Sequence, residues 1–237
     1  MFVKAQELQV AEQNTIVTTL DSNKDYVLLV DEIKRHQSIG EIKSKDAFEL
    51  IFGDKESKVS ANAAFVTLAD EAIIQGLQYE NGEVQLKAIF TVEKDGKKAI
   101  HHAVVQAGKV FVEQVIDHNP EHFEFVEELK TQKGAQESSD EIKEEAWYDG
   151  CLVFYNSGNG KTYYYKHCGK ECGDNGATGG GTPINTLDSC CRSHDRCYSN
   201  FGSNDCGCDR DLSVCANNAS DPGWWMVSEW ARLKSCK

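Results

Sequence analysis

The stretch CCRSHDRCY at residues 190–198 places three cysteines around a His-Asp pair. Cys190 and Cys197 are seven residues apart, and so are Cys208 and Cys215. Seven residues make two turns of an α-helix, so each pair lies on one face of a helix. The connection between the two segments is short, which makes the helices antiparallel. This arrangement predicts two cross-links between them, Cys197–Cys208 and Cys190–Cys215.

The same spacing places the His-Asp pair. His194 falls between the two cysteines of the first helix and on the same face, so it points toward the second helix. Asp195 is rotated by about 100° from it and faces another neighbour, the glycine-rich segment CGKECGDNGATGGGTP at 168–183. Asp209 begins the second helix at the level of the imidazole. We therefore expect Asp209 to reach the imidazole of His194, while Asp195 faces the glycine-rich segment.

Three interpretations of this cluster compete. The adjacent cysteines Cys190 and Cys191 do not have the usual C-x2-4-C spacing of zinc ligands, and ten cysteines exceed the needs of one tetrahedral site. A purely structural disulfide knot explains the cysteines but leaves polar groups on a buried seam, which is costly. A catalytic site explains both, because His194 oriented by Asp209 is a general base and Asp195 beside a carbonyl-rich loop suits a hard cation.

Composition divides the chain near residue 150. All ten cysteines lie after it, and the two sides differ in charge: residues 1–150 hold 29 acidic and 16 basic side chains, and residues 151–237 hold 9 of each. Such a density of cysteines is typical of a disulfide scaffold, which persists in oxidising compartments. We predict an α+β accessory domain or prodomain at 1–129, an acidic linker at 130–150, and a disulfide-rich, mainly α domain at 151–237.

The first domain reads as ordinary globular sequence without a catalytic motif. Residues 82–117 contain β-rich runs around Asp-Gly and Ala-Gly pairs and predict a meander of about three antiparallel strands. The segments at 45–52 and 61–77 have helix-compatible spacing. Two histidine pairs, His101-His102 and His118/His122, are interpreted as surface residues rather than as metal ligands, because strand neighbours point apart and a proline interrupts the second pair.

The motif C-C-x-x-H-D-x-C-Y, followed by C-x-C-D and a later cysteine, resembles the secreted phospholipase A2 superfamily. The match runs from Cys168 to Cys215, and GGGTPINTLDSCCRSHDRCY is similar to the family's calcium loop and first catalytic helix. Residues 1–150 have no counterpart in the family's core. The resemblance implies a calcium-dependent hydrolase that acts on the sn-2 ester of phospholipids.

The resemblance also implies a role for each residue of the cluster. His194 matches the general base that deprotonates a water, and Asp209 matches the carboxylate that fixes the imidazole. Tyr198 matches a tyrosine that hydrogen-bonds that carboxylate. Asp195 matches the side-chain ligand of a calcium ion, the implied cofactor, which polarises the ester carbonyl and stabilises the oxyanion.

The backbone part of the calcium site depends on the alignment of the loop. The family pattern C-G-x-G gives carbonyl ligands from His167, Gly169 and Glu171, with Glu171 in place of the second glycine. The alternative alignment moves the set to Glu171, Gly173 and Asn175. We adopt the first alignment and expect the substitution to change flexibility and charge without removing a ligand.

The resemblance adds a third disulfide, Cys168–Cys191, to the two that the spacing predicts. Four cysteines then remain, and three connectivities among them stay open. These four are Cys151, Cys172, Cys206 and Cys236.

The expected partner is a phospholipid membrane or micelle surface, and no nucleic acid is expected. The segment PGWWMVSEWARLKSC at 222–236 has tryptophans beside basic residues, which suits either the headgroup region or core packing. Residues 151–165 offer apolar side chains either as walls of an acyl-chain channel or for core packing. Residues 1–129 are a candidate inhibitory prodomain, released by cleavage near Lys130, Lys133 or Lys143, or else a domain that binds a partner or cell surface and leaves catalysis unchanged.

The leading prediction is thus a secreted, calcium-dependent phospholipase A2. The first ten residues lack the apolar core of a signal peptide, so we expect either a mature chain with an added methionine or another export route. The alternative is a catalytically weak, phospholipase-like toxin or binding module that uses the scaffold to recognise a membrane or receptor.

Overall fold

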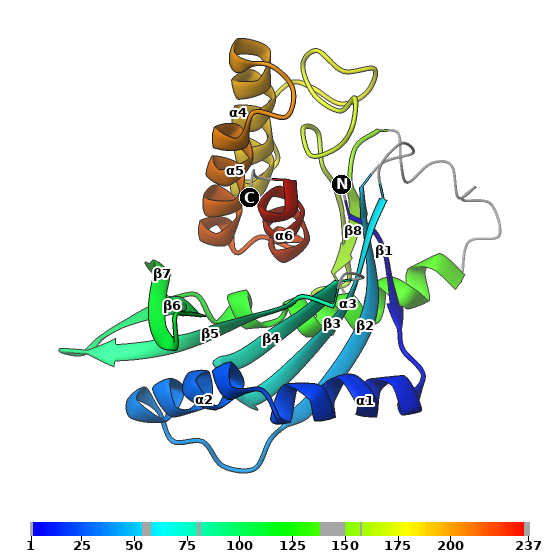
Figure 1. The fold of residues 1–237 in the computed structure, drawn as a ribbon. Helices are drawn as coiled ribbons and strands as arrows, with labels where there is room; N and C mark the ends of the chain where they lie inside the picture. The colour runs from blue at the N-terminus through cyan, green and yellow to red at the C-terminus, as the bar shows by residue number, and fades with distance from the viewer. Residues whose placement is uncertain (1, 54–57, 80–81, 138–149, 157, 235–237) are drawn as a thin grey trace. The chain divides into compact units, whose positions relative to one another are not determined.

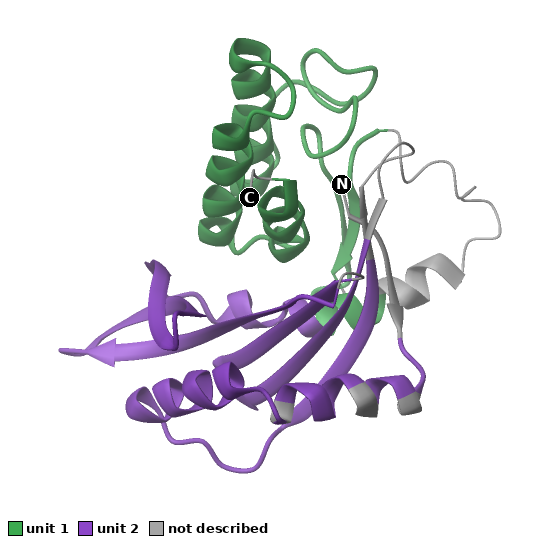
Figure 2. Cartoon of the chain, viewed as in Figure 1, with its two compact units in different colours: residues 1–4, 51–59, 127–237 green, residues 5–50, 60–126 purple. Residues whose placement is uncertain are grey.

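The computed structural model describes residues 2–53, 58–79, 82–137, 150–156 and 158–234 (Figure 1). The chain divides into two compact units (Figure 2). We call residues 1–4, 51–59 and 127–237 the disulfide unit, and residues 5–50 and 60–126 the sheet unit. The accessory domain at 1–129 stays a prediction, and most of the predicted linker, residues 138–149, lies outside the described residues.

A seven-stranded sheet follows the order of the chain, from β1 to β7. Strands β3 to β7 pair antiparallel with their neighbours. The helices α1 (Val10–Asp21) and α2 (Lys24–His36) cover one face of this sheet, where Leu29 and Ile33 are fully buried (Figure 1). The strands are β1 (Phe2–Glu7), β2 (Ser44–Gly53), β3 (Lys58–Ala69), β4 (Ala72–Tyr79), β5 (Val84–Lys94), β6 (Lys97–Gln106) and β7 (Lys109–Asp117).

The helices predicted at 45–52 and 61–77 are wrong, because these residues belong to β2, β3 and β4. In β3, the consecutive residues from Ala63 to Val66 have no exposed surface. A strand buried on both faces carries apolar side chains at every position, and therefore also at helical spacing. The helices form earlier in the chain, where the Asn23 side chain accepts from the backbone N–H of Asp25 and begins α2.

The predicted meander is confirmed by β5, β6 and β7. Its two turns have positive φ at both central residues, 54° and 73° at Asp95-Gly96 and 50° and 72° at Ala107-Gly108, as tight hairpins require. The surface interpretation is wrong for His102 and His122. Both are buried, and their Nε2 atoms lie 3.0 Å apart.

The disulfide unit contains a two-stranded antiparallel sheet and three consecutive helices. The strands are β8 (Val153–Asn156) and β9 (Lys161–Tyr164), and the helices are α4 (Thr186–Phe201), α5 (Cys206–Ala219) and α6 (Trp224–Lys234). The whole chain thus combines helices and antiparallel strands, as the predicted α+β mixture requires. No helix in the described ranges is long and apolar enough to span a bilayer.

Two elements precede the disulfide-rich segment, η1 (Pro120–Phe123) and α3 (Phe125–Glu137). Within the disulfide unit, the buried Glu128 of α3 holds two distant segments. Asn156 Nδ2 donates to its Oε1 at 2.9 Å, and the backbone N–H of Gly223 donates to its Oε2 at 3.4 Å. Gly223 directly precedes α6, so α3 helps to fix the start of that helix.

Four disulfides join the described residues. The three predicted bridges are confirmed, and of the open pairings the structure forms Cys151–Cys172. Cys206 is also disulfide-bonded, and Cys236 lies outside the described residues. Two of the bridges, Cys190–Cys215 and Cys197–Cys208, join the beginning of α4 to the end of α5 and the reverse, so the two helices run antiparallel. The third, Cys168–Cys191, joins the glycine-rich segment to α4.

Candidate active site

Side-chain caps set the register of the two helices that carry the candidate site. Asn185 Oδ1 accepts from the backbone N–H of Asp188 at 2.9 Å and begins α4. Asp205 Oδ1 accepts from the backbone N–H groups of Gly207 and Cys208 and begins α5. Together with the two cross-links, these caps determine which side chains meet along the seam between α4 and α5.

His194 and Asp209 meet on this seam. His194 Nε2 lies 3.0 Å from Asp209 Oδ1, and the two side chains are 7 % and 0 % exposed. A carboxylate only accepts hydrogen bonds, so Nε2 carries the hydrogen and Nδ1 is the ring nitrogen that can accept a proton. Tyr198 donates its hydroxyl hydrogen to the same Oδ1 at 2.6 Å. The structure thus brings these three residues together, and their catalytic roles stay predictions.

The surroundings of His194 keep its ring neutral near pH 7. Burial lowers the pKa of His194, the hydrogen bond and charge of Asp209 act in the opposite direction, and the charge of Lys234 lowers it further. The net pKa is below the ordinary value. The rings of Tyr198 and Trp230 lie 4.1 Å and 5.9 Å from the imidazole. A neutral, desolvated imidazole held by a carboxylate has the properties of a general base.

Asp195 turns toward the glycine-rich segment, as its position on the helix predicts. Its Oδ2 is buried and has no hydrogen-bond partner among the described residues. A Cβ placed on Gly173 would lie 2.6 Å from this oxygen and 3.3 Å from Nδ1 of His167. Burial, with the charges of Asp174 and Asp188, raises the pKa of Asp195 to about 7. An oxygen of this kind lacks a positive partner, which a bound cation would supply.

The first loop alignment predicts carbonyl ligands from His167, Gly169 and Glu171. All three residues line the same cavity as His194 and Asp195. Of the alternative set, Glu171 and Asn175 line it. Glu171 has a φ of 56°, in the left-handed region that favours glycine. Its carbonyl oxygen accepts from the backbone N–H of Thr178 at 3.1 Å. The backbone therefore adopts at Glu171 the kind of conformation for which a glycine would be suited.

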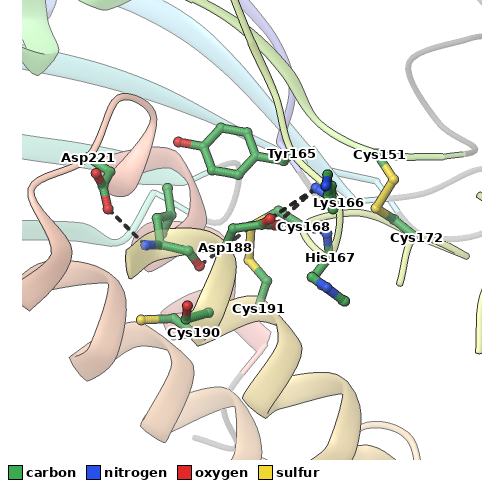
Figure 3. Close-up of a disulfide and its surroundings, with 12 residues drawn as sticks. Cys151, Tyr165, Lys166, His167, Cys168, Cys172, Asp188, Cys190, Cys191 and Asp221 are labelled. Atoms are coloured by element: carbon green, nitrogen blue, oxygen red, sulfur yellow. Dashed lines mark hydrogen bonds between the residues drawn. A yellow bond between two sulfur atoms is a disulfide. The ribbon is translucent and has the colours of Figure 1, made fainter. Parts of the chain in front are cut away.

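A residue outside the predicted set, Asp188, holds both ends of this loop. Its side chain is fully buried, and Oδ1 accepts from the backbone N–H groups of Lys166 and His167 at 3.0 Å and 2.8 Å (Figure 3). Its Oδ2 accepts from the backbone N–H of Ile184 at 3.0 Å. Asp188 thus ties the loop to the first turn of α4. The only sequence signal is an acidic residue three positions after a helix cap.

The cavity has a volume of about 390 Å³ and lies within the disulfide unit. Its lining joins the polar residues of the candidate site to apolar side chains from three segments, namely Leu152, Leu212, Met226 and Val227. Of the channel walls predicted in 151–165, Leu152 lines it, whereas Phe154 and Tyr165 are buried elsewhere in the core. The headgroup interpretation is wrong for Trp224 and Trp225, which are each 1 % exposed.

No group of three or more His, Cys, Asp or Glu side chains suited to a metal ion occurs in the described ranges. The predicted calcium site is of another kind, with a single carboxylate from Asp195 and backbone carbonyls from the loop. Hard cations accept such oxygen ligands. The buried Oδ2 of Asp195 beside Gly173 fits this kind of site.

No model of a known protein family matches the chain, and no solved structure matches its fold. Function must therefore be inferred from the chemistry of the site itself.

Proposed function

We propose that this protein is a calcium-dependent phospholipase A2, which hydrolyses the sn-2 ester of phospholipids to a fatty acid and a lysophospholipid. One observation carries the proposal. Adjacent residues of α4 provide a histidine backed by a buried carboxylate, His194 with Asp209 at 3.0 Å, and a carboxylate oxygen of Asp195 that lacks a partner. Both residues line one largely apolar cavity.

In this proposal His194 moves the proton. Nδ1 of the neutral ring takes a proton from a water whose oxygen attacks the ester carbonyl carbon. Asp209 holds Nε2–H and stabilises the imidazolium that forms. When the bond between the carbonyl carbon and the glycerol oxygen breaks, the imidazolium returns the proton to that oxygen. The neutral ring is then restored, and the apolar lining accommodates the acyl chain.

The calcium ion would be held by the carboxylate of Asp195 and by loop carbonyls, those of His167, Gly169 and Glu171 in the first alignment. When bound, calcium polarises the ester carbonyl and stabilises the negative charge that develops on its oxygen. Asp188 ties both ends of the loop to the first turn of α4, and a Cβ on Gly173 of this loop would lie 2.6 Å from Asp195 Oδ2, which supports a loop that closes over Asp195.

Fatty-acid release from phosphatidylcholine vesicles tests the proposal. We expect release by the full chain with calcium, none above background with a chelator, and a loss of at least about 10³-fold in His194→Gln. Ser193→Ala is the matched control, because Ser193 is an exposed neighbour on the same helix. Activity that persists in chelator or in His194→Gln would refute the mechanism. Vesicle binding without any release would favour the alternative, a phospholipase-like binding module.

Gly173→Ala tests the cation site separately. The new methyl group would lie 2.6 Å from Asp195 Oδ2, so we expect calcium affinity measured by calorimetry to fall by about 100-fold or more. Gly181→Ala is the control, because Gly181 also has a positive φ but a Cβ there meets nothing within 4 Å. Equal losses in both variants would assign the effect to backbone strain rather than to the cation site.

A further inference from the structure

Helix α6 contributes a restrained cation to the wall of the cavity. Lys234 lines the cavity, and its Nζ lies 5.1 Å from the centre of the Trp230 ring. The same Nζ donates to Asn204 Oδ1 at 3.3 Å. A lysine side chain has several rotatable bonds, and these two contacts hold its charge at one place. Both partners of the ammonium group, Trp230 and Asn204, also line the cavity.

The charge of Lys234 lies on the side of the cavity where the proposed base, His194, is found. Two lysines of the described residues line the cavity, Lys170 and Lys234. Lys170 belongs to the glycine-rich segment and is exposed. Lys234 approaches from α6, next to Trp230, whose ring packs edge-on against His194 with centroids 5.9 Å apart. Trp230 therefore contacts both the ammonium group of Lys234 and the imidazole of His194.

An ammonium group beside an apolar cavity is stabilised by an anionic ligand, and a hydrogen bond to a charged group is among the stronger ones. In a phospholipid, the phosphodiester is attached to the glycerol carbon next to the one that carries the sn-2 ester. A cation close to the base therefore lies where this anion is brought when the ester carbonyl faces His194.

We propose that Lys234, held by Trp230 and Asn204, binds the phosphodiester of the phospholipid substrate. This assignment rests on the proposed function, and it makes Lys234 a specificity residue that distinguishes phosphate-bearing esters from other esters of the same chain length. Lys234 recognises the phosphate and takes no part in proton transfer.

Ligand binding without turnover tests this assignment. The full chain is titrated by calorimetry with dodecylphosphocholine, dodecyl maltoside and laurate below their micelle concentrations. We expect Lys234→Met to bind dodecylphosphocholine about 10-fold more weakly and to bind the maltoside unchanged. Lys234→Arg keeps the charge and restores binding to within about threefold. Lys161→Met is the control, because Lys161 is exposed on β9 and lies outside the cavity lining.

Several outcomes would overturn the assignment. Equal losses for dodecylphosphocholine and the maltoside would mean that Lys234 only supports the structure. A loss confined to laurate would assign the lysine to a carboxylate, and no loss for any ligand, or a loss only in Lys170→Met, would remove it from recognition. Because none of these ligands contains an ester, the result is readable even if the chain proves to have no phospholipase activity.

Kinetics then connect binding to turnover. With a short-chain diacylphosphatidylcholine, Lys234→Met is expected to raise KM by about 10-fold and to change kcat by less than about twofold. With a phosphate-free diacylglycerol of the same acyl chains, both parameters should equal those of the wild type. A fall in kcat on both substrates would contradict a role in phosphate recognition.

Discussion

Each unit of this chain buries a pair that includes a histidine, and the two pairs have the same separation. In the disulfide unit, His194 Nε2 lies 3.0 Å from Asp209 Oδ1, and in the sheet unit His102 Nε2 lies 3.0 Å from His122 Nε2. Burial is the largest cause that lowers the pKa of each of these histidines. The two pairs therefore differ in the chemical identity of the partner, a carboxylate in one and a second imidazole in the other.

The partner decides what the ring can do. Two imidazoles that meet at Nε2 share one hydrogen, so one ring donates and the other accepts. The lowered pKa of both rings keeps both of them neutral near pH 7. Burial, with the charge of Lys87, lowers the pKa of His122 to about 3. In contrast, the hydrogen bond and charge of Asp209 oppose the effect of burial on His194. A buried histidine without such opposition is a structural group, whereas a carboxylate keeps proton transfer within reach of neutral pH.

Replacing the Asp209 carboxylate makes the partner of His194 neutral, as the partner of His102 is. Of the changes considered, it has the largest expected effect on activity. Asp209→Asn offers a neutral partner that can donate, so the imidazole can adopt the other tautomer and present N–H to the water. We expect kcat/KM for phosphatidylcholine hydrolysis to fall by about 10³-fold, which corresponds to about 4 kcal/mol of transition-state stabilisation.

The double variant His194→Gln/Asp209→Asn supplies the control. Residues that act as one unit are not additive, so the double variant should lose little more than His194→Gln alone. An Asp209→Asn protein within about tenfold of wild-type activity would show that the carboxylate does not set the function of His194.

The second difference between the pairs is covalent, because cross-links fix the helices that carry His194. Removing Cys190–Cys215 with two serines opens a closed loop with a sequence separation of 25. We expect the free energy of unfolding of the disulfide unit to fall by about 3 kcal/mol. All four tryptophans lie after residue 127, so tryptophan fluorescence in urea follows this unit alone.

The sheet unit provides the control for this variant. Hydrogen exchange of peptides from β5 and β6, measured by mass spectrometry, should be unchanged. If their protection fell by the same free energy as the fluorescence transition, the two units would unfold as one, and the separate effect of the disulfide would be disproved.

Acid should destabilise the sheet unit, whereas removal of the disulfide acts on the disulfide unit. His102 and His122 have folded pKa values below the unfolded value, about 3 for His122, so between pH 6.5 and 3 the unfolded chain binds more protons. Stability is therefore complete above pH 6.5 and declines as the pH falls, by about 1.4 kcal/mol per pH unit for each histidine. Hydrogen exchange of β6 at pH 7 and pH 5 measures this decline in the sheet unit.

His122→Gln removes one titrating group while keeping a side chain that can hydrogen-bond His102. Its stability should depend less steeply on pH, with a slope smaller by about one proton. The same slope as the wild type would mean that the histidine pair does not cause the acid sensitivity.

The sequence predicts best those features that depend on local spacing. The seam of α4 and α5 follows from cysteines seven residues apart, and the turn at Asp95-Gly96 follows from the residue types that tolerate positive φ. These features depend on neighbours within a few turns of the chain, so periodicity reports them directly.

Features that depend on distant partners were not predictable in this way. Asp188 binds the backbone N–H of His167, which is 21 residues away, and no motif marks that contact. The strands β3 and β4 are buried on both faces, so their apolar spacing does not distinguish them from helices. His102 and His122 meet only because the sheet places η1 against β6, and sequence neighbours give no sign of it.

Tyr198→Phe, which removes one of the two donors to Asp209, has the smallest expected effect. Tyr198 and His194 both donate to Oδ1, so Tyr198→Phe leaves the carboxylate with one donor fewer and more of its charge directed to the imidazole. This change raises the pKa of His194. Because the base must be neutral, the acid limb of the pH–rate profile should move to higher pH, while kcat at pH 8 falls by less than about fivefold and stability by about 1 kcal/mol. Tyr164→Phe, at an exposed position of β9, should change none of these three quantities. An acid limb that stays in place or moves to lower pH would show that Tyr198 does not share the charge of Asp209 with the histidine.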